Sequence, residues 1–259
     1  MCKQANIDYT SKHISNDPSS KKLYSFIRNK KNDNNGVAPL LENGKLLHTP
    51  ADLANCLNRQ FGSVFSKPTS KPPDLGPSPY PNMSHINITE NGVKLLLNKQ
   101  KTNKAAGPDK IQARILREAS EEIAPVLTLL FKASYHQGKI PDDWRHAIVS
   151  PIYKSGKNDR SKAVNYRPIS LTCLCCKLME HIVCSNLMTH LDNNNILTDY
   201  QHGFRKRRSC DTQLLITTDD LAKALDNKQQ VDCIQLDFSK AFDKVSHFLL
   251  QHKLNFYGI

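Results

Sequence analysis

A dense run of prolines limits what this chain can fold into. Six prolines, at positions 68, 72, 73, 77, 79 and 81, fall within residues 66–82. Each proline fixes its own φ angle and lacks a backbone N–H, so this segment can form neither a stable helix nor a strand. We therefore predict a linker over residues 66–82, between a helical lead-in over residues 1–65 and a larger folded part over residues 83–259.

The charge balance favours a polyanionic partner. The chain has 36 Lys and Arg residues against 24 Asp and Glu residues, a formal net charge of +12. Cationic side chains that contact phosphates release bound counterions, which drives association. No run of about 18 apolar residues is present, so we predict no transmembrane helix and no membrane partner. The first residues lack the apolar core of a secretory signal, so we expect an intracellular protein of the cytoplasm, the nucleus or both.

The eight cysteines are expected to be reduced thiols, because the chain is long and has no secretion signal. One cluster resembles a zinc knuckle, but only two residues separate its histidine from its last cysteine, where the knuckle needs four. The same stretch places Leu174, Leu178, Ile182 and Leu187 at helical spacing. We therefore favour a core helix over a zinc site formed by Cys173, Cys176, His181 and Cys184.

Apolar periodicity and turn residues predict a mixed chain of helices and two strands. The strands are residues 147–153 and residues 231–238, the second of them buried. Asn43-Gly44 and Gly107-Pro108-Asp109 are predicted turns. In the first half of the chain, helices are predicted near residues 21–29, from Thr49-Pro50 and from Thr89 to Leu97. Two more are predicted over 111–119 and 125–136, with a break near Pro125. The last three are predicted through the cysteine-rich stretch, from Ser209, and from near Lys240 toward Tyr257.

The first candidate for chemistry is an aspartate at the end of an apolar strand, in VDCIQLDFSKAFDKVSH. A carboxylate at a strand end is well placed to hold Mg²⁺, which prefers hard oxygen ligands. Phosphoryl transfer with two metal ions needs such carboxylates to activate the attacking oxygen and to stabilise the leaving one. The alternative is that Asp237 only caps the following helix, and this segment alone does not decide between the two.

The part LDFSKAFDKVSH resembles the first catalytic motif of the reverse transcriptases of non-LTR (LINE or jockey-like) retrotransposons. The resemblance implies that Asp237 binds both catalytic metal ions and that the carbonyl of Phe238 helps to hold metal. It also implies that Phe242, five residues after the aspartate, blocks the sugar 2′-hydroxyl and so selects deoxynucleotides. The alternative for Phe242 is a core aromatic, and Asp243 is interpreted as a structural carboxylate.

A second stretch, AIVSPIYKSGKNDRSKAVNYRPISL, resembles the fingers hairpin of the same family. The resemblance implies that Lys154 and Arg167 contact the triphosphate of the incoming nucleotide. Lysine offers a point charge, whereas arginine can hold phosphate oxygens with two parallel bonds. For Lys157, Arg160 and Lys162 we favour a solvated loop or loose contact with a nucleic-acid backbone.

A third stretch, ILTDYQHGFRKRRSCDTQLL, resembles the family segment Gln-x-Gly-Phe-Arg, matched here by Gln201, Gly203, Phe204 and Arg205. The resemblance implies that this region meets the template strand. Four cations beside the amides of a helix that starts at Ser209 also suit phosphate binding, and these are Arg205, Lys206, Arg207 and Arg208. The alternative is an exposed run of charge. Ser209-Cys210 departs from the Ser-Thr pair usual in the family.

Two upstream stretches extend the resemblance to about residues 20–259. NKAAGPDKIQARIL resembles the opening segment of the polymerase, and ADLANCLNRQFGSVFS resembles the stretch that joins endonuclease to polymerase. The implied fold is α/β (α+β), with the fingers and the start of the palm of a right-hand polymerase after a mainly helical lead-in. The implied activity is RNA-directed DNA synthesis with Mg²⁺, an RNA template, a DNA primer and deoxynucleoside triphosphates, without an obligate protein partner.

The family's later pair of adjacent aspartates is not found after Asp237. Since one carboxylate cannot hold two metal ions in working geometry, we expect the isolated chain to be a fragment that does not polymerise DNA. We also expect the strand over residues 231–238 to lack sheet partners and to expose its edges. The alternative function is a non-catalytic RNA- or DNA-binding remnant. A viral RNA-copying polymerase is disfavoured by Phe242, because RNA synthesis must admit the 2′-hydroxyl.

Overall fold

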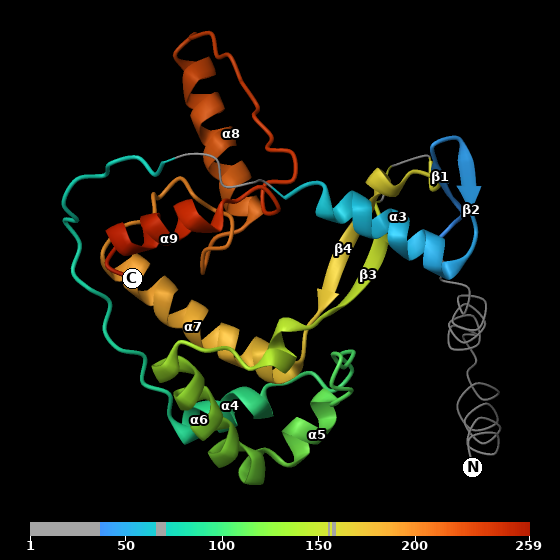
Figure 1. Cartoon of the computed structure of the whole chain (residues 1–259). Coiled ribbons are helices and arrows are strands. Elements are labelled where there is room, and N and C mark those ends of the chain that lie inside the picture. Colours follow the sequence, from blue (N-terminus) through green and yellow to red (C-terminus); the bar gives the residue numbers. More distant parts are fainter. Residues whose placement is uncertain (1–36, 66–70, 155, 157–158) are drawn as a thin grey trace, which may run out of the picture. The chain divides into compact units, whose positions relative to one another are not determined.

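The computed structural model describes residues 37–65, 71–154, 156 and 159–259, and the helix predicted near residues 21–29 lies outside them. Figure 1 shows the course of the chain. In chain order the elements are β1 (Leu40–Glu42), β2 (Lys45–Leu47), α3 (Pro50–Gly62), α4 (Glu90–Asn98), α5 (Ala113–Glu118), α6 (Ser120–Gln137), β3 (Ile148–Tyr153), β4 (Tyr166–Leu171), α7 (Leu174–Asn193), α8 (Cys210–Asp226) and α9 (His247–Phe256), with short 3-10 helices at Asp142–Arg145 and Ala163–Asn165.

The chain forms two compact units, each made of segments that are distant in sequence. Of the described residues, the first unit combines 37–60 with 151–154, 156 and 159–167, and the second combines 61–65 and 71–150 with 168–259. The predicted strand at residues 147–153 is confirmed as β3, which pairs with β4 in a two-stranded sheet. Within the described residues, no helix has the length and apolar character that crossing a bilayer requires.

A tight hairpin opens the described part of the first unit. β1 and β2 are antiparallel, with Leu40 opposite Leu47. The predicted turn between them is confirmed, since Asn43 and Gly44 have φ angles of 51° and 77°, as a two-residue type I′ turn requires. Leu40 is fully buried, and Arg59 of α3 forms an ion pair with Glu42 of β1 at 2.5 Å. The hairpin is therefore held against α3 by a buried side chain and an ion pair.

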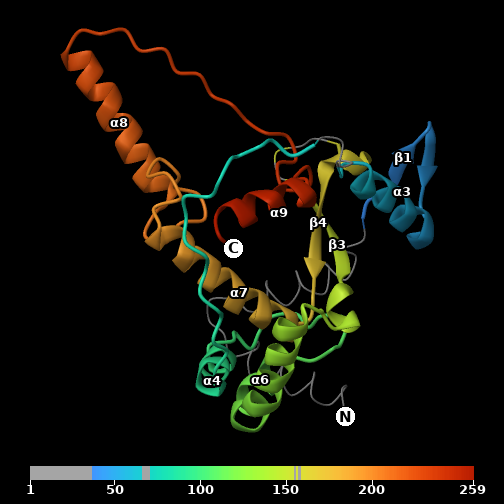
Figure 2. The same ribbon diagram turned by 60° about the vertical axis from the view of Figure 1, so that its left-hand side comes forward.

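The core of the second unit lies among α4, α5, α6 and α7. In Figures 1 and 2, α4 and α6 lie side by side at the N-terminal part of α7. The helix predicted from Thr89 is confirmed as α4, and Thr89 caps it, since its Oγ1 accepts a hydrogen bond from the backbone N–H of Gly92. Phe131 of α6 is fully buried and meets the ring of Trp144 edge-on at 5.7 Å. The buried aliphatic side chains around it include Val93, Leu97, Leu116, Leu127, Leu174 and Leu178.

The predicted helix break at Pro125 is wrong, because α6 runs through Pro125 and the break lies at Ala119. Proline removes one backbone donor, whose acceptor in a helix would be the carbonyl four residues earlier, at Glu121. Glu121 is exposed, so water can satisfy that carbonyl. Meanwhile Ala124 and Leu127 on the same helix are buried in the core, and their burial outweighs the loss of one hydrogen bond.

The helix predicted through the cysteine-rich stretch is confirmed as α7, with Leu174 and Leu178 in the core. Cys173 precedes the helix, and its sulfur accepts a hydrogen bond from the N–H of Cys176 at 3.3 Å. These two cysteines are buried, whereas His181 and Cys184 are exposed. Nowhere in the described parts of the chain do three His, Cys, Asp or Glu side chains gather so that they could hold a metal ion.

The thiols of Cys175 and Cys176 in α7 are expected to react slowly with alkylating reagents. Burial raises the pKa of Cys175 to about 11 and that of Cys176 to about 12. At pH 8 their reactive thiolate fractions are therefore about a hundredfold or more below that of an ordinary thiol, and they rise tenfold per pH unit. Cys184, Cys210 and Cys233 are exposed and should react first. Mass spectrometry after iodoacetamide treatment measures the order, and equal labelling in urea is the control.

The C-terminal part of the second unit is less buried than predicted. The helix predicted from Ser209 is confirmed as α8, for which Ser209 is the N-cap, and Ser209 and Thr212 form a capping box by bonding to each other's backbone N–H groups. None of the residues of α8 is buried, and in both Figures 1 and 2 the helix projects from the rest of its unit. All four leucines of α8 are therefore exposed, and these are Leu214, Leu215, Leu221 and Leu225.

The prediction of a buried strand over residues 231–238 is wrong. These residues form no strand, and the side chains of Ile234, Leu236 and Phe238 are 83%, 83% and 80% exposed. A strand needs a neighbour to pair its backbone groups, and none of the described strands lies beside this segment. The last helix begins at His247 rather than near Lys240, because Lys240 has a φ of 55° and Ser246 provides the cap.

Candidate functional site

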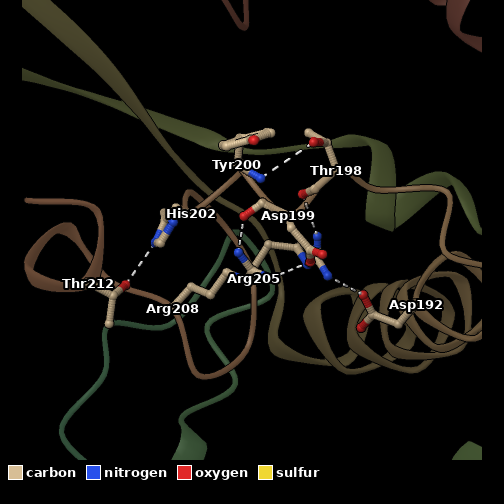
Figure 3. A network of polar contacts seen from close by, with 8 residues as sticks. All are labelled: Asp192, Thr198, Asp199, Tyr200, His202, Arg205, Arg208 and Thr212. Atoms are coloured by element: carbon tan, nitrogen blue, oxygen red, sulfur yellow. Dashed lines mark hydrogen bonds and ion pairs between the residues drawn. The ribbon is translucent and has the colours of Figure 1, made fainter. Parts of the chain in front are cut away.

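The loop that carries the Gln-x-Gly-Phe-Arg match is fastened by two arginines (Figure 3). The guanidinium of Arg205 forms an ion pair with Asp192, in the last turn of α7, at 3.1 Å, and donates to the carbonyl of Thr198 at 3.2 Å. The guanidinium of Arg208 forms an ion pair with Asp199 at 2.6 Å and also donates to the backbone carbonyl of the same residue. Both arginines therefore bind the protein itself and fix the loop between α7 and α8.

A further contact attaches the loop to the start of α8. His202 Nδ1 lies 2.8 Å from the hydroxyl of Thr212, in the first turn of the helix (Figure 3). The amide of Gln201 donates to the carbonyl of Gly203 at 3.2 Å, which closes a tight bend. Gln201 and Gly203 thus shape the loop in this structure.

Two of the four predicted phosphate-binding cations remain available to a ligand. The side chains of Arg205 and Arg208 are only 13% and 24% exposed, and their charges are balanced by aspartates. Lys206 and Arg207 are exposed and have no acidic partner in the described parts of the chain. Arg207 has a φ of 60°, so the backbone turns sharply between the two paired arginines. The bend presents Lys206 and Arg207 outward.

The loop that carries these two cations also carries exposed aromatic rings. Phe204 meets Phe242 edge-on, with ring centroids 5.7 Å apart and an interplanar angle of 80°. Their side chains are 85% and 77% exposed, and Tyr200 in the same loop is 84% exposed. Phe242 is therefore not a core aromatic. The contact joins two motifs that are far apart in the sequence, the loop predicted to meet the template and the segment predicted to read the sugar.

Asp237 lies in the exposed segment that precedes Phe238 and Phe242. It does not cap the following helix, since Ser246 holds that position in α9. No cluster of metal-binding side chains surrounds it in the described residues. Asp237 and the carbonyl of Phe238 are oxygen ligands of the kind that a divalent ion prefers, but on their own they do not form a metal site.

The triphosphate candidates lie in the first unit, near the loop between β3 and β4. The backbone N–H of Lys154 donates to the carbonyl of Asn165 at 2.8 Å, and the Lys154 ammonium donates to the carbonyl of Val164 at 2.7 Å. Arg167 is exposed on β4, two residues after Asn165. Lys154 and Arg167 therefore flank the loop between the two strands.

The cations within this loop have structural partners. Lys162 forms an ion pair with Asp159 at 3.2 Å, and the guanidinium of Arg160 lies over the ring of Tyr153 at 5.0 Å. The buried Tyr166 donates its hydroxyl to the carbonyl of Arg160 at 2.8 Å. Hydrogen bonds from Ser161, followed by Lys162, lower the pKa of Asp159. Lys157 lies outside the described residues.

Sequence reasoning missed the acidic residues that organise both basic loops. These are Asp159 in the hairpin and Asp192 and Asp199 beside the arginines. The available signal was the presence of an acid within about ten residues of each basic run, which favours local ion pairs over a free cationic surface.

Comparison with known proteins gives a consistent set of relatives. Residues 153–259 match the family described as reverse transcriptase (RNA-dependent DNA polymerase). The chain is 32% identical over 156 residues to the probable RNA-directed DNA polymerase from transposon X-element of Drosophila melanogaster, covering 60% of this chain and 17% of that protein. It is 31% identical over 166 residues to the RNA-directed DNA polymerase from mobile element jockey of the same fly, covering 64% and 18%. The chain thus spans about a sixth of the length of these relatives.

Proposed function

We propose that this chain supplies the nucleotide- and template-binding part of an RNA-directed DNA polymerase. The premise is that residues 153–259 belong to the reverse transcriptases of non-LTR retrotransposons. Enzymes of this family act on nucleic-acid templates and nucleotides with a divalent metal ion. The observation that carries the proposal is the contact between Phe204 and Phe242, which links the segments assigned to the template and to the incoming nucleotide.

In this proposal each candidate residue has a role that its chemistry suits. Phe242 packs against the sugar and leaves no room for a 2′-hydroxyl, and Phe204 braces it. Lys154 and Arg167, which flank the loop between β3 and β4, bind the triphosphate of a deoxynucleotide. Asp237, with the carbonyl of Phe238, contributes oxygen ligands toward Mg²⁺. The remaining ligands of the metal ion would have to come from outside the described residues, which do not complete a metal site.

The RNA template is proposed to run over the loop between α7 and α8. Lys206 and Arg207 would hold phosphodiester groups, since their charges are not used within the described parts of the protein. The exposed rings of Tyr200 and Phe204 offer faces on which unpaired bases can stack. Such a surface binds single strands with little sequence preference. We further propose that the polymerase extends a DNA primer. We also propose that residues 66–82 separate the helical lead-in from the polymerase part of the chain.

Removal of the two available cations is expected to weaken RNA binding and reduce its salt dependence. In the variant Lys206→Ala/Arg207→Ala, two phosphate contacts are lost, so the slope of log K against log salt should become shallower by about 1.4. Fluorescence anisotropy with a labelled, unstructured RNA and the full chain measures this slope at several salt concentrations.

The matched control is Arg59→Ala/Lys223→Ala, which removes the same charge from residues paired with Glu42 and Asp219. Its slope should stay close to that of the unmodified chain. If both double variants change the slope equally, binding depends on net charge alone, and the proposed template path is wrong.

A further inference from the structure

The proline-rich segment packs against α9 and the residues that follow it. As predicted, its described residues, 71–82, form neither helix nor strand. The imidazole Nε2 of His252 lies 3.1 Å from the carbonyl of Pro73, and the N–H of Met83 donates to the carbonyl of Gly258 at 2.7 Å. These contacts hold both ends of the segment, which we name the proline strap (residues 71–83).

The middle of the proline strap is attached by a tyrosine ring and a close backbone contact. Tyr80 meets the rings of Phe256 and Tyr257 edge-on, at 6.0 and 5.5 Å. A Cβ atom at Gly258 would overlap the carbonyl of Pro81, and Gly258 has a φ of +75°. The strap therefore fits against a backbone that only glycine supplies without strain.

One hydroxyl lies at the centre of these contacts. Ser78 Oγ donates to the carbonyl of Phe256, the last residue of α9, at 2.6 Å, and accepts from the N–H of Tyr80 at 3.2 Å. Ser78 is exposed, is followed by Pro79, and lies in irregular chain that a kinase cleft can accept in extended form. The carbonyl it binds belongs to the negative end of the α9 helix dipole.

We propose that Ser78 is a phosphorylation site for a proline-directed protein kinase and that the phosphate releases the proline strap from α9. In the transfer, Ser78 Oγ forms a bond to the terminal phosphorus of ATP as the bond to ADP breaks, and the hydroxyl proton passes to a base of the kinase. The product has lost the donor that bound Phe256 and carries a charge of about −1.5 to −2. That charge lies against the carbonyl oxygens at the end of α9, and the repulsion detaches the segment.

Two other Ser/Thr-Pro pairs in the chain are less suited to a kinase. The hydroxyl of Thr49 bonds to Asp52 at 2.7 Å and caps α3, and Ser150 lies within β3. To become substrates, Thr49 would have to give up its cap of α3 and Ser150 would have to leave a strand, whereas Ser78 lies in irregular chain. They therefore serve as internal controls for site selection.

Release of the proline strap would affect α9, which follows the residues assigned to catalysis in the sequence. α9 begins ten residues after Asp237, and the carbonyl of Tyr257 is bound by Nε2 of the buried His190 in α7 at 2.7 Å. The strap and His190 together hold the end of α9. An effect of phosphorylation on nucleotide binding rests on the proposed function, but release of the strap does not.

The test is phosphorylation of the full chain by a proline-directed kinase with ATP, followed by mass-spectrometric mapping and amide hydrogen exchange. We expect phosphate on Ser78, and exchange at Met83 and across residues 71–83 about tenfold faster than in the unmodified chain. Absence of phosphate from Ser78, with Thr49 or Ser150 modified instead, would overturn the proposal. Unchanged exchange would overturn it too. So would slower exchange, because it would mean that Lys253, the cation near Tyr257, captures the phosphate.

Two variants separate lost hydrogen bonding from charge repulsion. Ser78→Ala removes only the hydroxyl, and exchange should rise by a smaller factor than in the phosphorylated chain. Ser78→Asp adds a negative charge at the same place, so its exchange should exceed that of Ser78→Ala. If the two variants exchange at equal rates, charge at residue 78 does not control the strap, and the proposed switch is wrong.

Discussion

Replacement of Asp237 with asparagine is expected to slow DNA synthesis by about 10³-fold. The protein for this measurement is a chimera, in which residues 153–259 of this chain stand in place of the matching segment of the jockey polymerase. Asparagine keeps the size and shape of the side chain but removes its negative charge. A divalent cation prefers charged oxygen ligands, so loss of this charge weakens the hold on the ion. Primer extension on an RNA template measures the effect, with the unsubstituted chimera as the reference.

The matched control is Asp243→Asn, six residues further along the same segment. Asp243 is interpreted as a structural carboxylate, so its replacement should change the rate by only about twofold. If both variants retain a rate within about tenfold of the reference, Asp237 is not a metal ligand. Equal large losses would instead indicate a general sensitivity of this segment to charge.

Local signals in the sequence predicted the elements that depend on neighbouring residues. The caps at Thr89 and Ser209 and the turn at Asn43-Gly44 all form as expected. In each case one side chain, or one residue that tolerates a positive φ, satisfies the backbone within a few positions. Such features can be predicted from the sequence because their energetics do not depend on the rest of the fold.

Elements that depend on distant partners were predicted less well. Residues 231–238 have the apolar alternation of a strand, but alternation does not provide a neighbouring strand, and the segment stays irregular. Pro125 is a helix breaker by local rules, yet burial of Ala124 and Leu127 carries α6 through it. The proline strap was predicted to be a linker, and its docking on α9 depends on contacts with residues almost 180 positions away.

The candidate site shows the same division. The sequence identified the basic run from Arg205 to Arg208 but could not show that Asp192 and Asp199 neutralise two of its four charges. It identified Phe204 and Phe242 separately, and only the fold brings their rings together. Residue type predicts what a side chain can bind, whereas the partner it binds is set by tertiary structure. The roles of these residues stay predictions until binding and activity are measured.

Replacement of Gly107 with alanine is expected to destabilise the second unit by about 1–3 kcal/mol. Gly107 is buried at the predicted Gly107-Pro108-Asp109 turn, which is confirmed by a 3.0 Å bond from the N–H of Lys110 to its carbonyl. A Cβ atom there would lie 2.6 Å from the backbone nitrogen of Cys173 and 2.7 Å from its Cα. Backbone cannot move aside as a flexible side chain can, so the loop must separate from the start of α7.

Urea unfolding of the full chain measures this loss. The protein has one tryptophan, Trp144, which packs against Phe131 in the core of the second unit, so its fluorescence reports on that unit. The matched control is Gly203→Ala, because a Cβ atom at Gly203 would meet nothing within 4 Å. Its stability should be unchanged or raised by up to about 1 kcal/mol, since alanine restricts the unfolded chain. Equal stability of the two variants would mean that the Gly107 turn and the N-terminus of α7 are not in direct contact.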